Sequence, residues 1–132
     1  MICSPEYGPE LSLAFGNRSA ALYHAGQYED CLKDIELALK YRYPKNLEHK
    51  LHQRRGQCFT KLGQQVEARN AFNKAMTALE LVPKLSADKK ESMIRDIHAL
   101  MAEMGKLTNL REIDGLYQIF FSCFRTCLSC QI

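Results

Sequence analysis

Two basic residues four positions apart, Lys50 and Arg54, form the pair in this 132-residue chain best suited to bind an anion. Residues at that spacing share one face of a helix, so both side chains can reach one ligand. An arginine fork with a lysine point charge suits a terminal carboxylate beside acidic side chains. Asn17 could add a donor that carries no charge. The alternative is that Asn17 and Arg18 tie helices together, and that Lys50 and Arg54 belong to a solvated face.

A cluster of cysteines near the end of the sequence is the second candidate for chemistry. Cys123, Cys127 and Cys130 have the spacing by which radical S-adenosylmethionine enzymes hold an iron–sulfur cluster, but Ser129 replaces the usual aromatic residue and no α/β-barrel pattern precedes them. A zinc site needs a fourth ligand, and no histidine lies near the cluster. We therefore predict no metal site and no cofactor. We expect the histidines to be surface residues: His24, His49, His52 and His98.

Composition is that of an ordinary globular chain long enough for one small domain. The net charge of +3 is too small to indicate nucleic-acid binding. Lys40–Lys61 holds seven basic residues and one acid, but no aromatic stacking platform accompanies them. No apolar run follows Met1, so we expect no signal peptide. No apolar run reaches the length of about 18 residues that spans a membrane. Because Cys31 and Cys58 fall on helical core positions, we predict a reducing compartment, cytoplasmic and/or nuclear.

Apolar residues recur at helical spacing along most of the sequence, which predicts an all-α fold. Proline after Gly8 favours a helix start there, and Gly26 and Gly63 are suited to end helices in the left-handed conformation. Asn46 and Ser86 are candidate N-caps. The predicted helices are about Gly8–Ala25, Tyr28–Tyr41, Asn46–Leu62, Gln65–Leu81 and Ser86–Met104.

The first two helix pairs superpose when one is moved by 37 positions. Small residues then meet small residues and large apolar residues meet large ones, which indicates an internal helix–turn–helix repeat. Short side chains allow two helices to approach closely. The paired positions are Ser19 with Gly56, Leu22 with Phe59, Gly26 with Gly63, Cys31 with Ala68, Ile35 with Phe72, and Ala38 with Ala75.

This pattern resembles the tetratricopeptide repeat over about residues 12 to 83, although the period exceeds the usual 34 residues by three and the terminal proline is displaced. The extra length falls in the loop around Arg42–Asn46. The resemblance implies a helical solenoid of two helix pairs with a capping helix, in a domain at residues 9–104. Residues 105–132 form an apolar, cysteine-containing tail whose order the sequence does not decide.

Within that family, the chain resembles the co-chaperones that hold acidic C-terminal peptides in a concave groove. Asn17 lies nine residues before Gly26, Arg54 lies nine before Gly63, and Lys50 lies four before Arg54, as in their carboxylate clamps. The resemblance implies a peptide site at Asn17, Lys50 and Arg54, with a heat-shock chaperone tail as one partner. Those clamps also use a lysine and an asparagine from a preceding repeat. Only about ten residues precede the first helix, so we expect weak affinity.

The runs "NRSAAL" and "GQYEDCLKDI", followed by "YP" and a helix with the pattern K…R…G, resemble the SET- and MYND-domain protein family over about residues 9 to 104. The resemblance implies a protein-lysine methyltransferase with a zinc-binding MYND module. However, neither a SET pattern nor a MYND pattern occurs in this sequence. We therefore expect a fragment or short form that is not an enzyme and that binds a peptide or protein partner, with no nucleic-acid or membrane partner. The alternative is a methyltransferase segment that packs on its catalytic domain. The oligomeric state stays open.

Overall fold

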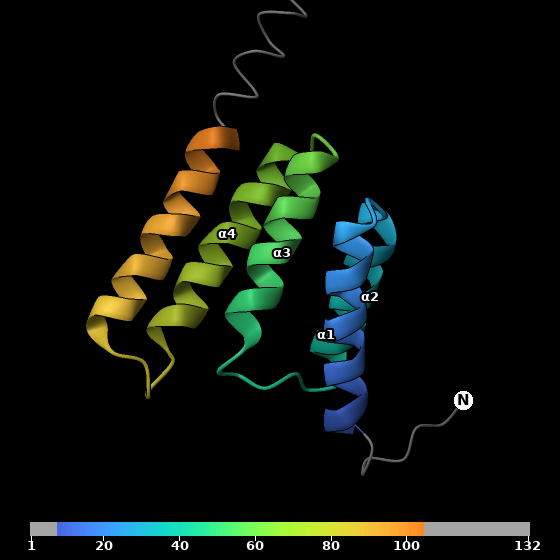
Figure 1. Ribbon diagram of the computed structural model, residues 1–132, viewed down its shortest axis with the longest axis horizontal. Helices are drawn as coiled ribbons and strands as arrows, with labels where there is room; N and C mark the ends of the chain where they lie inside the picture. Colours follow the sequence, from blue (N-terminus) through green and yellow to red (C-terminus); the bar gives the residue numbers. More distant parts are fainter. Residues whose placement is uncertain (1–7, 105–132) are drawn as a thin grey trace, which may run out of the picture. The chain divides into compact units, whose positions relative to one another are not determined.

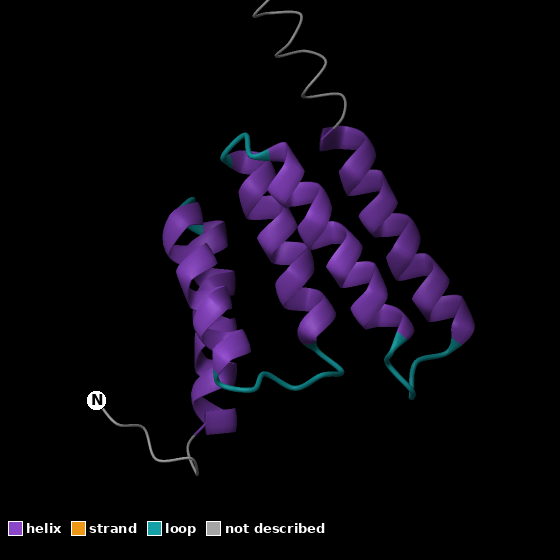
Figure 2. Cartoon of the chain, turned by 180° about the vertical axis from the view of Figure 1, so that it is seen from behind, coloured by secondary structure: helices purple, strands orange, loops and turns teal. Residues whose placement is uncertain are grey.

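The computed structural model describes residues 8–104, and all regular structure in that range is α-helical (Figure 2). The helices are α1 (Gly8–His24), α2 (Tyr28–Lys40), α3 (Glu48–Lys61) and α4 (Gln65–Glu80), followed by a helix at residues 87–104. The predicted all-α class is confirmed. By its internal contacts the chain divides into Met1–Leu100 and Met101–Ile132, and the second part is described only where residues 101–104 continue the last helix. The predicted tail at 105–132 lies outside the described residues.

Figure 1 shows α1 and α2 as one helical hairpin and α3 and α4 as another. The turns of the two hairpins are alike in detail. Gly26 has φ of 79° and Gly63 has φ of 78°, the left-handed conformation that glycine adopts without a steric penalty. Gln27 N donates to Leu22 O at 2.9 Å, and Gln64 N donates to Phe59 O at the same distance.

The equivalence continues into the second helix of each hairpin. Cys31 N donates to Gln27 O at 3.0 Å, and Ala68 N donates to Gln64 O at 3.0 Å. All these donors and acceptors are related by the 37-residue shift. The structure therefore confirms the internal repeat at the level of backbone hydrogen bonds.

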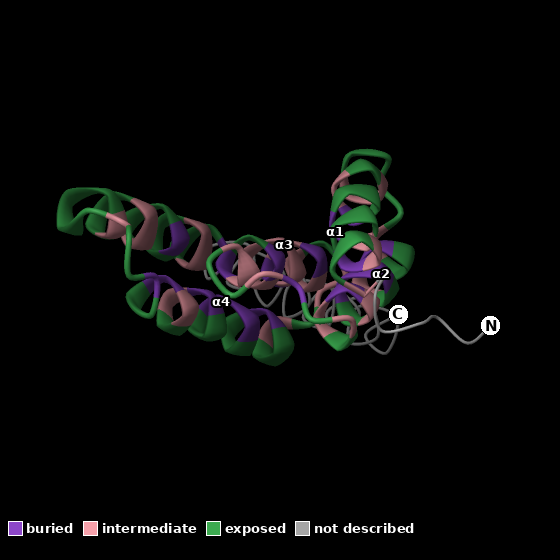
Figure 3. Cartoon of the chain, turned by 90° about the horizontal axis from the view of Figure 1, so that it is seen from below, coloured by how far each residue is buried: buried purple, intermediate pink, exposed green. Residues whose placement is uncertain are grey.

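Small residues lie where the helices approach one another, as the sequence pattern predicts. A side chain added at Gly56 would have its Cβ 2.7 Å from the ring of Phe72, which is 1% exposed. A Cβ added at Gly16 would lie 2.6 Å from the ring of Tyr43. Buried residues line the facing sides of α3 and α4 in Figure 3. The buried members of the paired repeat positions are Ser19, Cys31, Ile35, Ala38, Gly56, Ala68, Phe72 and Ala75.

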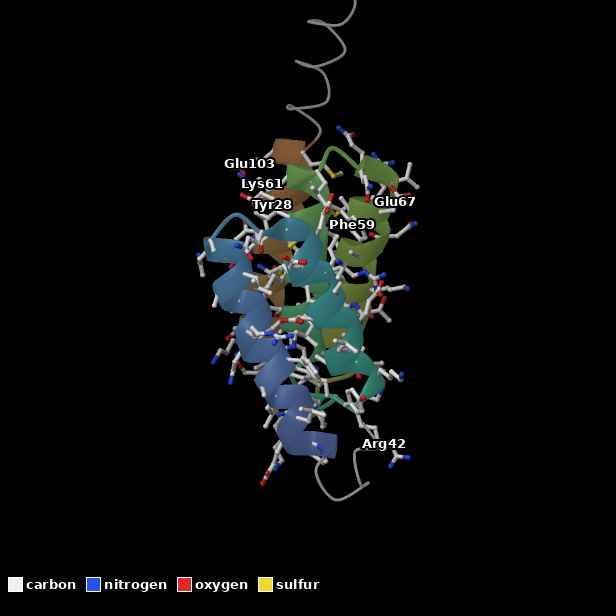
Figure 4. All side chains as sticks on the ribbon, turned by 90° about the vertical axis from the view of Figure 1, so that its right-hand side faces the viewer. Tyr28, Arg42, Phe59, Lys61, Glu67 and Glu103 are labelled. Atoms are coloured by element: carbon white, nitrogen blue, oxygen red, sulfur yellow. The ribbon has the colours of Figure 1, made fainter. Side chains whose placement is uncertain are left out.

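The loop between the hairpins contains one unusual backbone conformation. Arg42 has φ of 61°, the left-handed region in which a side chain is disfavoured. It follows the C-cap of α2, and Tyr43 N donates to Ala38 O at 3.1 Å, which closes the end of that helix. In Figure 4, Arg42 lies at the end of the molecule opposite the one that carries Tyr28 and Phe59.

The helix ends correct the sequence prediction in one respect. Asn46 is not the N-cap of α3, because the helix begins after Leu47, whose side chain cannot cap it. The backbone from Pro44 makes a turn instead, in which Leu47 N donates to Pro44 O at 2.9 Å. Ser86 lies at the expected place before the last helix, and its carbonyl accepts from Lys90 N at 3.0 Å.

Candidate functional site

The junction of α1 and α3 brings together the helices that carry the predicted peptide-binding residues. Arg54 Nη1 donates to the carbonyl of Gly16 at 3.1 Å and to Ser19 Oγ at 2.8 Å. Ser19 Oγ in turn donates to the Gly16 carbonyl at 2.6 Å. This network joins the second hairpin to the first at the turn of α1 that contains Asn17.

The three predicted residues therefore differ in their surroundings. Asn17 and Lys50 are exposed, and neither side chain has a hydrogen-bond partner in the part of the chain that the structure describes. Arg54 is half-buried and has one guanidinium nitrogen committed to α1. The sequence did not reveal that Arg54 bonds to α1 and so joins α3 to it. Its other two guanidinium nitrogens, Nε and Nη2, have no hydrogen-bond partner within residues 8–104.

Arg18 binds Asp34 across the first hairpin. Its Nε donates to Asp34 Oδ2 at 2.6 Å and its Nη2 donates to Oδ1 at 2.8 Å. The Arg18 side chain is 61% exposed and that of Asp34 is 5% exposed. The hydrogen bonds to Asp34, followed by its charge, raise the pKa of Arg18. Arg18 thus ties α1 to α2, as the alternative sequence interpretation proposed.

Two free cysteines meet in the core next to the Arg54 network. Cys58 Sγ donates to Cys31 Sγ at 3.3 Å, and Cys31 Sγ donates to the Ser19 carbonyl at 3.1 Å. Both residues are fully buried, as predicted. The hydrogen bond between the thiols raises the pKa of Cys58 and lowers that of Cys31, because Cys58 holds its proton to donate it. Their pairing was not evident from positions 27 residues apart in sequence.

The sequence of this chain is similar to those of one group of known proteins. No protein-family model matches the chain, and no solved structure matches it. Human protein-lysine N-methyltransferase SMYD4 is 36% identical over 103 residues, which cover 78% of this chain and 13% of the human protein. Mouse SMYD4 gives the same identity and coverage. Chicken SMYD4 is 36% identical over 107 residues, covering 81% of this chain and 13% of its own length.

This chain is related to one segment of SMYD4. The chain spans about 13% of the length of the SMYD4 proteins reported above. The family resemblance drawn from the sequence runs is thereby confirmed. The SMYD4 match alone assigns no role to Asn17, Lys50 or Arg54, whose part in peptide binding stays a prediction.

In this SMYD4-related chain, one sequence expectation about the histidines is wrong. His49 is 4% exposed, because the start of α3 faces the segment that follows α4, and His52 is half-buried. His24 and His98 are exposed, as expected. Burial lowers the pKa of both imidazoles, and the charge of Lys50 lowers that of His49 further. The charge of Glu48 acts on His52 in the opposite direction.

Two features of residues 8–104, the part of the SMYD4-related chain that the structure describes, concern metals and membranes. No group of three or more histidine, cysteine or acidic residues there could hold a metal ion. None of the helices in the same range is long and apolar enough to cross a membrane. The cysteine motif at Cys123, Cys127 and Cys130 lies outside the described residues.

Proposed function

We propose that the described helices form a non-catalytic interaction module that binds an extended acidic peptide through Asn17, Lys50 and Arg54. The supporting observation is the network from Arg54 to Gly16 and Ser19, because it holds the turn of α1 that carries Asn17 against the helix that carries Lys50 and Arg54. A peptide that ends in a free carboxylate beside acidic side chains fits this set of donors.

The residues contribute in different ways. Lys50 is exposed and supplies a mobile positive charge. Asn17 supplies an amide donor from the neighbouring helix. Arg54 supplies the donors that it does not use on α1, already held in place by its contact with Gly16. The heat-shock chaperone tail remains one candidate partner, from the resemblance to co-chaperone clamps, and we place the module in the cytoplasm and/or nucleus.

A peptide titration tests this function. The probe is an acidic peptide with a free C-terminal carboxylate, compared with the same peptide amidated at its C-terminus. Lys50→Ala should weaken binding of the free acid by about tenfold or more, because a hydrogen bond to a charged group contributes about 1.5–3 kcal/mol. Lys33→Ala, which removes an exposed lysine of α2, is the matched control. Equal affinity for the two peptides, or an equal loss in the Lys33 variant, would overturn the proposal.

Arg54→Ala is the less direct variant because Arg54 also joins α1 to α3. The peptide affinity of Arg54→Ala should be compared with the thermal stability of the same variant, because a loss of folding would also weaken binding. Asn17→Ala removes a side chain with no partner among residues 8–104, so it should reduce affinity without changing stability.

The relation to SMYD4 supports a second function. SMYD4 proteins are named protein-lysine N-methyltransferases, so this segment would pack on or regulate such a catalytic domain. A methylation assay separates the two functions. We expect the chain alone to transfer no methyl group and, under the second function, to change the activity of an added SMYD4 catalytic domain.

A further inference from the structure

A pocket of about 540 Å³ lies where the start of α3 meets the segment that follows α4. Figure 1 shows the loop before α3 and the loop after α4 at the same end of the helices. The volume is in the range of small-molecule sites. The pocket is lined by Asn46, Leu47, His49, Lys50, Val82, Pro83, Lys84, Leu85, Lys89 and Met93.

The lining combines positive charge with apolar surface. Its three charged residues are all lysines, Lys50, Lys84 and Lys89, and no carboxylate belongs to it. Each comes from a different segment: α3, the loop after α4 and the last helix. The apolar side chains include Leu47 and Met93. Such a pocket is complementary to a ligand with one anionic group and one apolar part.

His49 is a buried polar residue in the wall of the pocket. It is 4% exposed, and its ring interacts with the backbone of Asn46. Buried polar groups are nearly always paired with protein, water or ligand. Burial and the charge of Lys50 lower its pKa, and the carbonyl of Asn46 only partly opposes this. The lowered pKa favours the neutral ring, so the lysines alone carry the positive charge of the pocket.

We propose that this pocket binds a small carboxylate that carries an apolar chain, such as a medium-chain fatty acid. The carboxylate accepts from the lysines, and the chain packs against the apolar residues of the lining. Charge-assisted hydrogen bonds orient the ligand, and removal of apolar surface from water supplies most of the affinity. The pocket shares Lys50 with the proposed peptide site, whereas Lys84 and Lys89 belong to the pocket alone and let its test be separated from the peptide function.

Three small probes test the proposal by NMR titration of the whole chain: octanoate, octanol and acetate. We expect octanoate to bind and to shift the His49 ring signals, octanol to bind at least about tenfold more weakly because it lacks the charge, and acetate to bind more weakly still because it lacks the chain. Equal binding of octanol, or no binding of octanoate, would overturn the proposal.

The matched variants are Lys84→Gln with Lys89→Gln, and Lys33→Gln with Lys61→Gln as the control pair. All four lysines are exposed, so these changes should leave the fold intact. We expect the first pair to weaken octanoate binding at least about tenfold and the control pair to leave it unchanged. An equal effect of both pairs would show non-specific attraction and refute the site. Tighter binding of an acetylated tripeptide ending in leucine would also refute it, by showing that the pocket receives a peptide.

Discussion

Replacing Gly56 by alanine tests the close approach of α3 and α4 on which the second hairpin depends. The new Cβ would lie 2.7 Å from Cδ1 and from Cε1 of Phe72 and 2.8 Å from its Cζ. Carbon atoms pack favourably at about 3.5 Å and beyond, so the ring would have to retreat by about 0.8 Å. Phe72 is 1% exposed, and three atoms of a rigid ring are involved at once. The ring cannot move alone, and the helices must separate.

Two opposing terms set the size of the effect. Alanine is favoured over glycine inside a helix by about 0.5–1 kcal/mol. Overpacking a filled core costs about 1–3 kcal/mol. We expect the Gly56→Ala variant to lose about 1 kcal/mol in the free energy of unfolding, measured by urea denaturation with circular dichroism. Gly8→Ala is the control, because its Cβ would meet nothing closer than the Tyr41 carbonyl oxygen at 3.9 Å.

A double-mutant cycle identifies the source of the loss. If the contact with Phe72 is responsible, Phe72→Leu should cost less in the Gly56→Ala background than in the wild type, with a coupling of at least about 0.5 kcal/mol. Stabilisation by Gly56→Ala to the full extent of its helix propensity would refute the reasoning. So would a pair of changes whose effects simply add.

Three further predictions follow from single features of the fold. Arg42→Gly should raise the free energy of unfolding by about 0.5–1 kcal/mol in urea, because it relieves a left-handed residue, whereas Arg42→Ala should not. The pKa of His49 is lowered in the folded state, so below about pH 6.5 the unfolded chain binds more protons than the folded chain. The free energy of unfolding should therefore fall as pH falls below that value, by at most about 1.4 kcal/mol per pH unit for this residue. His49→Leu should reduce that pH dependence in thermal unfolding scans between pH 7 and 5, and the part due to His52, whose pKa burial also lowers, should stay. Cys31 and Cys58 should resist alkylation by iodoacetamide at pH 8 until the chain unfolds, as peptide mass mapping with and without urea would show.

Arg54 belongs both to the proposed peptide site and to the contact between α1 and α3. The residue ties α3 to α1 before any ligand is present, so part of the cost of positioning a charged side chain is met by folding. Lys50 and Asn17 have no such tie within the described chain, and substitutions there separate binding from stability more clearly than substitutions of Arg54.

The sequence alone determined the helices, their turns and the repeat. These depend on local chemistry: helical spacing of apolar residues, and the ability of Gly26 and Gly63 to adopt a left-handed backbone. The relation to SMYD4 could also be found from short sequence runs, because they keep their order and spacing. Small residues at positions such as Gly56 indicated close packing before any partner was known.

Only the tertiary structure decided which residues meet across the hairpins. The pair of Arg18 with Asp34, the contact of Cys31 with Cys58, and the bonds from Arg54 to α1 all join residues whose distance in sequence says nothing of their distance in space. The same holds for the burial of His49, which we expected on the surface because the sequence offers it no metal-ligand partner. Periodicity tells which face of a helix is apolar, but the partner of each polar side chain is set by how the helices dock.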